Sequence, residues 1–98
     1  MIPITTVIPT VMSRIKKLPF GHGLDLRTYK RDRSILITRE TNDRFTVIQN
    51  GFGKDRFEIS TVKLPRLLKG LLKKEFPRSN KVRLYSVDEG GREIPRKI

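Results

Sequence analysis

Apolar residues recur with a period of two through the middle of the chain, as in half-buried β-strands. The alternating apolar positions are Leu24, Leu26, Ile35, Ile37, Phe45, Val47, Phe57 and Ile59. Polar turns separate these runs, and residues 50–53, Asn-Gly-Phe-Gly, tolerate the positive φ of a tight turn. Four antiparallel strands in succession are the simplest arrangement of these segments.

The spacing then changes to that of a helix. One stripe contains Leu64, Leu67, Leu68, Leu71 and Leu72. Ser60 or Thr61 can cap the start of this helix. Pro65 suits its first turn, and Pro77 prevents its continuation. The leucine stripe is therefore predicted to pack on one face of the sheet.

The predicted fold class is α+β: a four-stranded antiparallel sheet followed by an amphipathic helix on one face, with an extra C-terminal strand. That strand comes from the alternating run Lys81 to Val87, in which Val82 and Leu84 share one side. An OB-like barrel is the alternative, because there too a helix sits between the third and the later strands.

The chain is expected to have three parts. Residues 1–23 contain three prolines, and their apolar residues between Ile8 and Leu18 follow the spacing of a short amphipathic helix. That helix packs on its own domain or binds a membrane surface or a partner. Residues 24–87 form the α+β domain, and residues 88–98 form a charged tail.

Charge indicates the class of partner. The 98 residues contain 22 Lys and Arg against 10 Asp and Glu, a net charge of +12. Such an excess favours a polyanion, and nucleic acid is the expected partner. Cysteine is absent, which excludes disulfides and thiolate metal sites. No apolar stretch approaches the ~20 residues of a membrane span, and residues 1–18 do not read as a signal peptide. We expect an intracellular protein of the cytoplasm or nucleoid, and no membrane partner.

Basic and aromatic residues alternate with the apolar ones, so they are predicted to share the opposite sheet face. The candidate nucleic-acid-binding residues on the predicted strands and their turn are Arg27, Tyr29, Arg31, Arg44, Arg56, Lys81, Arg83 and Tyr85. Lys69 and Lys73, on the outer side of the predicted helix, are further candidates. Cations follow the phosphates of a single strand, while each aromatic ring that stacks on a base contributes roughly 1–3 kcal/mol. The competing interpretation is an ordinary solvated sheet face.

A second basic concentration spans residues 63–83, where Glu75 is the only acid. Lysines on the outer side of an amphipathic helix are commonly a solvated face. A helix built for solubility interleaves Glu with Lys, so the missing acids favour phosphate contacts instead. The alternative function is a protein-interaction module, or a component of an RNA particle, that uses this helix.

Residues suited to catalysis are few. His22 is the only histidine, and residues 51–54 lack the strand-to-helix context of a phosphate-binding loop. The aspartates show no paired arrangement, which leaves a metal-dependent nuclease unsupported. We expect no enzyme activity, no cofactor, no metal and no small-molecule substrate.

The order of four strands and one helix resembles that of the Pur-alpha and Whirly-like single-strand binders and of transcriptional coactivators of the positive cofactor four type. The segments that carry the likeness are residues 24–30, 34–39, 44–52, 56–60 and 62–76, about half of the chain. The resemblance implies a curved sheet that grips single-stranded DNA or RNA, a role in transcription regulation, and a homodimer. The strand at 81–87 departs from the pattern, which leaves the dimer geometry open.

Overall fold

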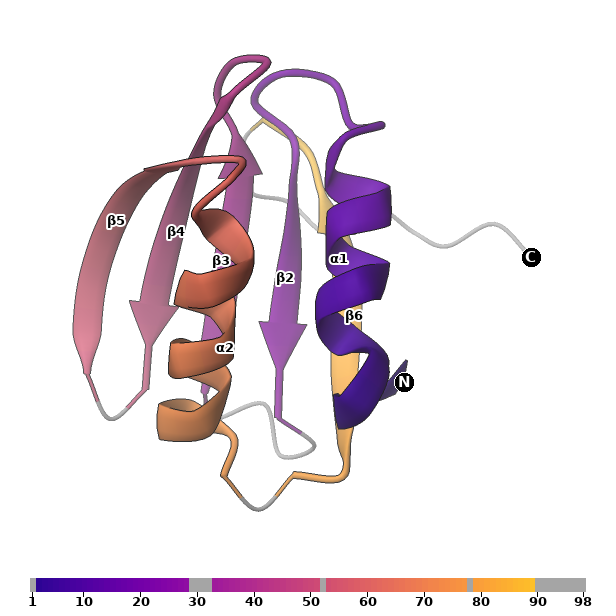
Figure 1. Cartoon of the computed structure of the whole chain (residues 1–98), viewed down its shortest axis with the longest axis vertical. Coiled ribbons are helices and arrows are strands. Elements are labelled where there is room, and N and C mark those ends of the chain that lie inside the picture. Colours follow the sequence, from indigo (N-terminus) through magenta and orange to yellow (C-terminus); the bar gives the residue numbers. More distant parts are fainter. Residues whose placement is uncertain (1, 29–32, 52, 78, 90–98) are drawn as a thin grey trace.

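The computed structural model describes residues 2–28, 33–51, 53–77 and 79–89. These residues form an α+β fold in which one six-stranded antiparallel sheet carries two α-helices on a single face (Figure 1). The elements are β1 (Ile2–Pro3), a 3-10 turn η1 (Ile4–Thr6), α1 (Val7–Ile15), β2 (Gly23–Arg27), β3 (Ser34–Arg39), β4 (Arg44–Asn50), β5 (Lys54–Ser60), α2 (Leu64–Glu75) and β6 (Lys81–Val87).

The strand order is β1-β6-β2-β3-β4-β5, and every neighbouring pair is antiparallel. The predicted four strands are therefore an undercount. β1 and β6 extend the same sheet on the β2 side, because the chain returns after α2 and inserts β6 between β1 and β2. The two ends of the order, β1 and β5, do not pair with each other, so the sheet is open and the OB-like barrel is not confirmed.

Both helices follow the spacing of their apolar residues. Val7, Val11 and Ile15 of α1 are fully buried, and Leu64, Leu68, Leu71 and Leu72 of α2 are at most 7% exposed. α2 has its proline at the first turn, where no intrahelical N–H bond is lost. Figure 1 shows α1 and α2 side by side over the same sheet face, and their buried side chains belong to one core cluster.

Strand register fixes which residues meet the helices. Leu24 lies opposite Ile37, and Ile37 lies opposite Val47. All three are fully buried. Residues directly opposite in an antiparallel sheet point to the same face, so the intervening positions all point away from the helices.

A buried acid joins α2 to the β4–β5 hairpin. The Glu75 side chain is fully buried, and its Oε2 accepts hydrogen bonds from Gln49 Nε2 at 2.7 Å and from the Gly53 N–H at 3.1 Å. Arg33 Nη1 donates to the Glu75 backbone oxygen at 3.1 Å. A Cβ at position 51 would collide with Glu75 Oε1, so Gly51 is required by close approach.

Arg39 provides the matching connection for α1. Its Nη1 donates to the backbone oxygens of Lys16 at 2.8 Å and Leu18 at 2.7 Å, and its guanidinium lies 5.1 Å from the Phe20 ring centroid. The last carbonyls of a helix have no intrahelical partner and attract a cation. The end of α1 is thereby held against β3.

Removal of the Glu75 carboxylate should destabilise the fold. Glu75→Ala leaves the Gln49 amide and the Gly53 N–H without their acceptor, so we expect the free energy of unfolding to fall by about 3 kcal/mol. Glu75→Gln keeps one acceptor oxygen and should cost less. Urea denaturation with an unchanged m-value measures both.

The exposed Glu40→Ala is the matched control, with an expected change within about 0.5 kcal/mol. A Glu75→Ala protein as stable as this control would show that the carboxylate does not hold the hairpin.

Candidate nucleic-acid interface

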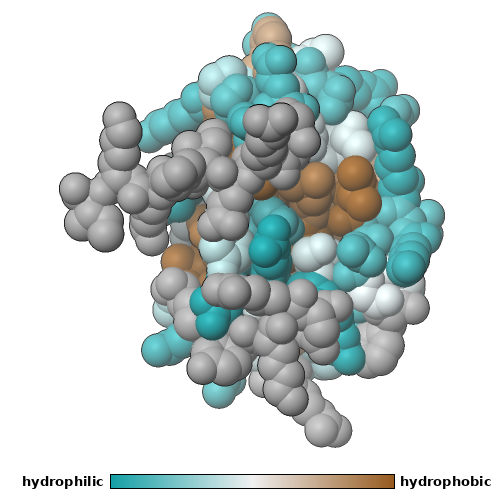
Figure 2. All heavy atoms as spheres, turned by 180° about the vertical axis from the view of Figure 1, so that it is seen from behind, coloured by the Kyte–Doolittle hydropathy of each residue, from teal (hydrophilic) through white to brown (hydrophobic). Residues whose placement is uncertain are grey.

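The sheet face that points away from the helices, here called the open face, is not covered by either helix. Figure 2 views the molecule from this side and shows hydrophobic residues near the middle with hydrophilic residues around them. The register arranges its side chains in rows that cross the strands.

One row contains most of the apolar surface. Across β6, β2, β3, β4 and β5 it consists of Tyr85, Asp25, Leu36, Ile48 and Arg56, each directly opposite the next. Ile48 is 38% exposed, and Leu36 and Tyr85 are partly exposed. In this row, here called the apolar row, aliphatic and aromatic side chains are therefore exposed to solvent in the middle of the sheet.

The neighbouring row is polar and basic. It consists of Arg83, Arg27, Ser34, Asn50 and Lys54, again opposite one another. On each strand, the residue of this basic row lies two positions from the residue of the apolar row, which is about 6.8 Å along the strand. Apolar and cationic groups thus run in parallel across the sheet.

Three side chains at the β2–β6 end of these rows form a compact cluster. Arg27 Nε and Nη2 both lie 2.8 Å from Asp25 Oδ2, and the guanidinium carbon lies 4.8 Å from the Tyr85 ring centroid. The Arg27 charge is therefore balanced by a carboxylate, and one side of the Tyr85 ring is covered. Arg27 here orients Tyr85 more than it adds net charge to the surface.

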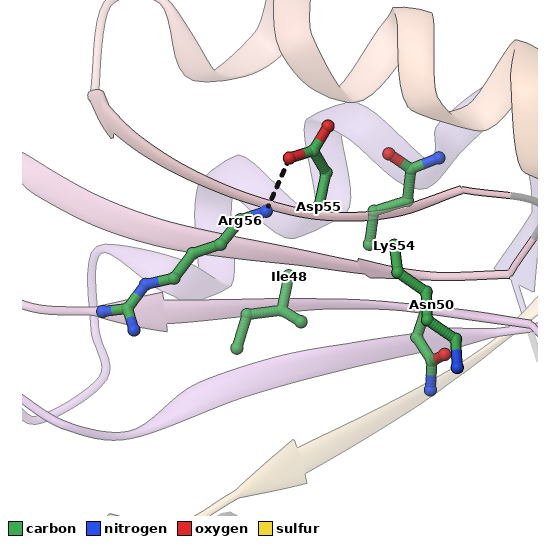
Figure 3. A pocket seen from close by; sticks show the side chains of 6 residues that line it. Ile48, Asn50, Lys54, Asp55 and Arg56 are labelled. Carbon is green, nitrogen blue, oxygen red and sulfur yellow. Dashed lines mark hydrogen bonds between the residues drawn. The ribbon is translucent and has the colours of Figure 1, made fainter.

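The β4–β5 end of the open face is more accessible. Ile48, Asn50, Lys54 and Arg56 line a shallow depression of about 440 Å³, and Figure 3 shows them pointing to one side of the strands while Asp55 points toward the helices. Arg56 Nη2 lies 3.8 Å from Glu58 Oε1 in a largely exposed pair. Such a pair contributes little, so Arg56 can exchange it for a phosphate.

The open face brings together six of the predicted site residues: Arg27, Arg44, Arg56, Lys81, Arg83 and Tyr85. Lys69 and Lys73 lie on α2, which packs on the other side of the sheet, so they cannot belong to the same surface. Tyr29 and Arg31 lie outside the described residues.

Leu36, Ile48, Asn50 and Lys54 also belong to this face, and none of them is among the predicted site residues. The sequence could have predicted this for Leu36, because it lies between the inward-facing Ile35 and Ile37 of an alternating strand. The sequence predicts a turn at residues 50–53, whereas β4 extends to Asn50 and β5 begins at Lys54.

The outer surface of the two helices is a second basic region, here called the helix surface. Its exposed cations are Arg14, Lys16, Lys17, Lys63, Arg66, Lys69, Lys73 and Lys74. Glu75 is the only acid of the two helices, and it is buried. Lys69 and Lys73 flank an apolar groove of about 480 Å³ that Ile4, Ile8, Leu72 and Phe76 help to line.

The described part of the chain has neither a cluster of metal ligands nor a membrane-spanning helix. No three of its His, Asp and Glu side chains gather as metal ligands would. Neither helix has the length and apolarity needed to cross a membrane. His22 lies in the turn before β2, where its backbone oxygen accepts the Arg39 N–H at 2.9 Å.

Similarity to other proteins assigns no family to this chain. No protein-family model, curated protein or solved structure matches it significantly. The resemblance to single-strand-binding coactivators stays a prediction, and function must be argued from the open face and the helix surface.

Proposed function

We propose that this protein binds single-stranded nucleic acid, without catalysis, across the open face of its sheet. One observation carries the proposal: an apolar row and a basic row lie side by side on a face that neither helix covers. Single strands require this combination, because their bases present apolar faces while their phosphates need cations.

The apolar row supplies the surface for bases. Tyr85 offers an aromatic ring, and Leu36 and Ile48 offer aliphatic contact in the same row, beyond the buried Asp25. The five strands from β6 to β5 span roughly 19 Å at the spacing of neighbouring strands. A duplex keeps its bases stacked inside and gains nothing from this strip, so the apolar row favours unpaired strands.

The charge balance of the open face favours phosphate. Its cations are Arg27, Arg44, Lys54, Arg56, Lys81 and Arg83, and its described acids are Asp25 and Glu58. Both acids already lie beside an arginine. Cations on the helix surface strengthen the field around the whole molecule and raise the rate of encounter with a polyanion.

A second function is favoured by the helix surface. Its exposed cations occur without an exposed acid on either helix, which suits docking of an acidic protein or placement in an RNA particle. A regulatory role in transcription is a finer proposal that rests on the resemblance alone.

Binding should prefer single strands and weaken steeply with salt. Fluorescence anisotropy with labelled single-stranded DNA, single-stranded RNA and duplex of equal length compares the three ligands. If about four phosphates are neutralised, the slope of log affinity against log salt for single strands should be about −3. Equal affinity for duplex, or binding that does not respond to salt, would contradict the proposal.

Three substitutions separate the two rows and the two surfaces. Tyr85→Ala should weaken single-strand binding about tenfold with an unchanged salt slope, because it removes stacking but no charge. Lys54→Gln should reduce the slope by about 0.7, since one phosphate contact is lost. The matched charge removal Lys69→Gln on α2 should change both quantities little. If Lys69→Gln instead has the largest effect, the helix surface is the binding site.

A further inference from the structure

β5 is an unpartnered edge. It pairs with β4 on one side, and no described strand lies on its other side. The edge is seven residues long, whereas β1 at the opposite end of the sheet has two. Long edge strands invite pairing with a further strand, because their outer N–H and C=O groups have no ladder partner.

The register identifies those outer groups. Hydrogen bonds Gly51 N–H to Gly53 O and Thr61 N–H to Asp43 O, both 3.0 Å, continue the β4–β5 ladder at its two ends. Because bonded pairs alternate in an antiparallel ladder, odd-numbered residues of β5 bond to β4. The even-numbered residues therefore direct their backbone groups outward. The Arg56 N–H agrees, since it donates at 3.3 Å to the neighbouring Asp55 Oδ1.

The sequence of this edge is complementary to itself. When two copies of β5 pair antiparallel with all seven residues opposite one another, the centre is Phe57. Arg56 then lies opposite the second copy's Glu58, and this pair occurs twice by symmetry. Lys54 lies opposite Ser60. All of these are even-numbered residues, so the outward backbone groups of both copies meet in the same register.

The neighbouring symmetric registers are disfavoured. A shift that centres the pairing on Arg56 places two guanidinium groups opposite each other, although it also places Lys54 opposite Glu58 twice. A shift to Glu58 places two carboxylates opposite each other. Like charges directly opposite are destabilising, and opposite charges are stabilising. Charges on an edge strand commonly prevent unspecific pairing. Of these three registers, the Phe57-centred one alone has opposite charges facing each other and no like-charged pair.

Side chains at the centre favour the same arrangement. Arg56 and Glu58 are 66% and 74% exposed, so both can turn toward a second copy. Phe57 is only partly buried and would lie against its symmetry mate on the helix side of the joined sheet. Directly opposite residues of a non-bonded pair approach to about 4.5 Å between Cα atoms, close enough for ring contact.

We propose that β5 is the interface of a homodimer in which two sheets join edge to edge through the Phe57-centred register. The two open faces then become one surface, with Arg56 of each copy at the seam. This inference does not depend on nucleic-acid binding, and its test contains no nucleic acid.

Charge exchange at the seam tests the register. Sedimentation velocity over rising concentration should detect a wild-type dimer. R56E and E58R should each weaken association about tenfold or more, because each places like charges opposite one another on both sides of the central Phe57 pair. The double variant R56E/E58R restores opposite charges and should restore the dimer. K16E, just after α1, and E40R, in the β3–β4 turn, make the same charge changes away from β5 and should associate as the wild type.

A single thiol gives a second measurement. The chain has no cysteine, so F57C places one thiol per copy at the symmetric centre, within the Cα separation that a disulfide spans. Oxidation should cross-link F57C rapidly and the neighbouring I59C slowly. A monomeric wild type at millimolar concentration, a double variant that stays monomeric, or equal cross-linking of both thiols would overturn the proposal.

Discussion

Burial of one sheet face under two helices is the constraint on which the rest of this structure depends. The fully buried residues Leu24, Leu26, Ile35 and Ile37 come from the strands, and their partners come from α1 and α2. Complete burial of each such side chain stabilises the fold by about 1.5–3 kcal/mol. Because strand residues alternate, this burial also determines which side chains must face outward on the other side.

Polar groups then fix how the helices sit on that core. Glu75 connects the end of α2 to Gln49 and to the backbone at Gly53, and Arg39 binds the carbonyls of Lys16 and Leu18 just after α1. Buried polar groups are costly when unpaired, so a shifted helix would lose these bonds together. The β4–β5 hairpin is held in this way by the helix layer, although its outer edge is free. β5 is thus held firmly on its β4 side while its other edge is unpaired, which suits the proposed pairing with β5 of a second copy.

Two basic surfaces on opposite sides of a thin molecule require different explanations. The open face combines cations with Tyr85, Leu36 and Ile48, and its acids are matched to arginines. The helix surface has more exposed cations and no exposed acid, and its apolar residues are mostly turned inward. The open face has both apolar groups suited to bases and cations suited to phosphates. The helix surface has exposed cations that contribute mainly to the electrostatic field of the molecule. Under the proposed function, both surfaces attract a polyanion by their charge, and the open face alone orients it.

Local periodicity was enough to predict from the sequence the alternation of the strands, the stripe of α2, and the face shared by Arg44, Arg56 and Arg83. It could not reveal β1, whose two residues have no period, or the position of β6 beside β2, which depends on a pairing distant in sequence. The Arg27, Asp25 and Tyr85 cluster and the burial of Glu75 also arise from register and packing. The leucine stripe already places Lys69 and Lys73 on the outer side of α2, but only the tertiary structure shows that this side lies opposite the open face, because a helix face has no direction in the molecule until the helix is packed.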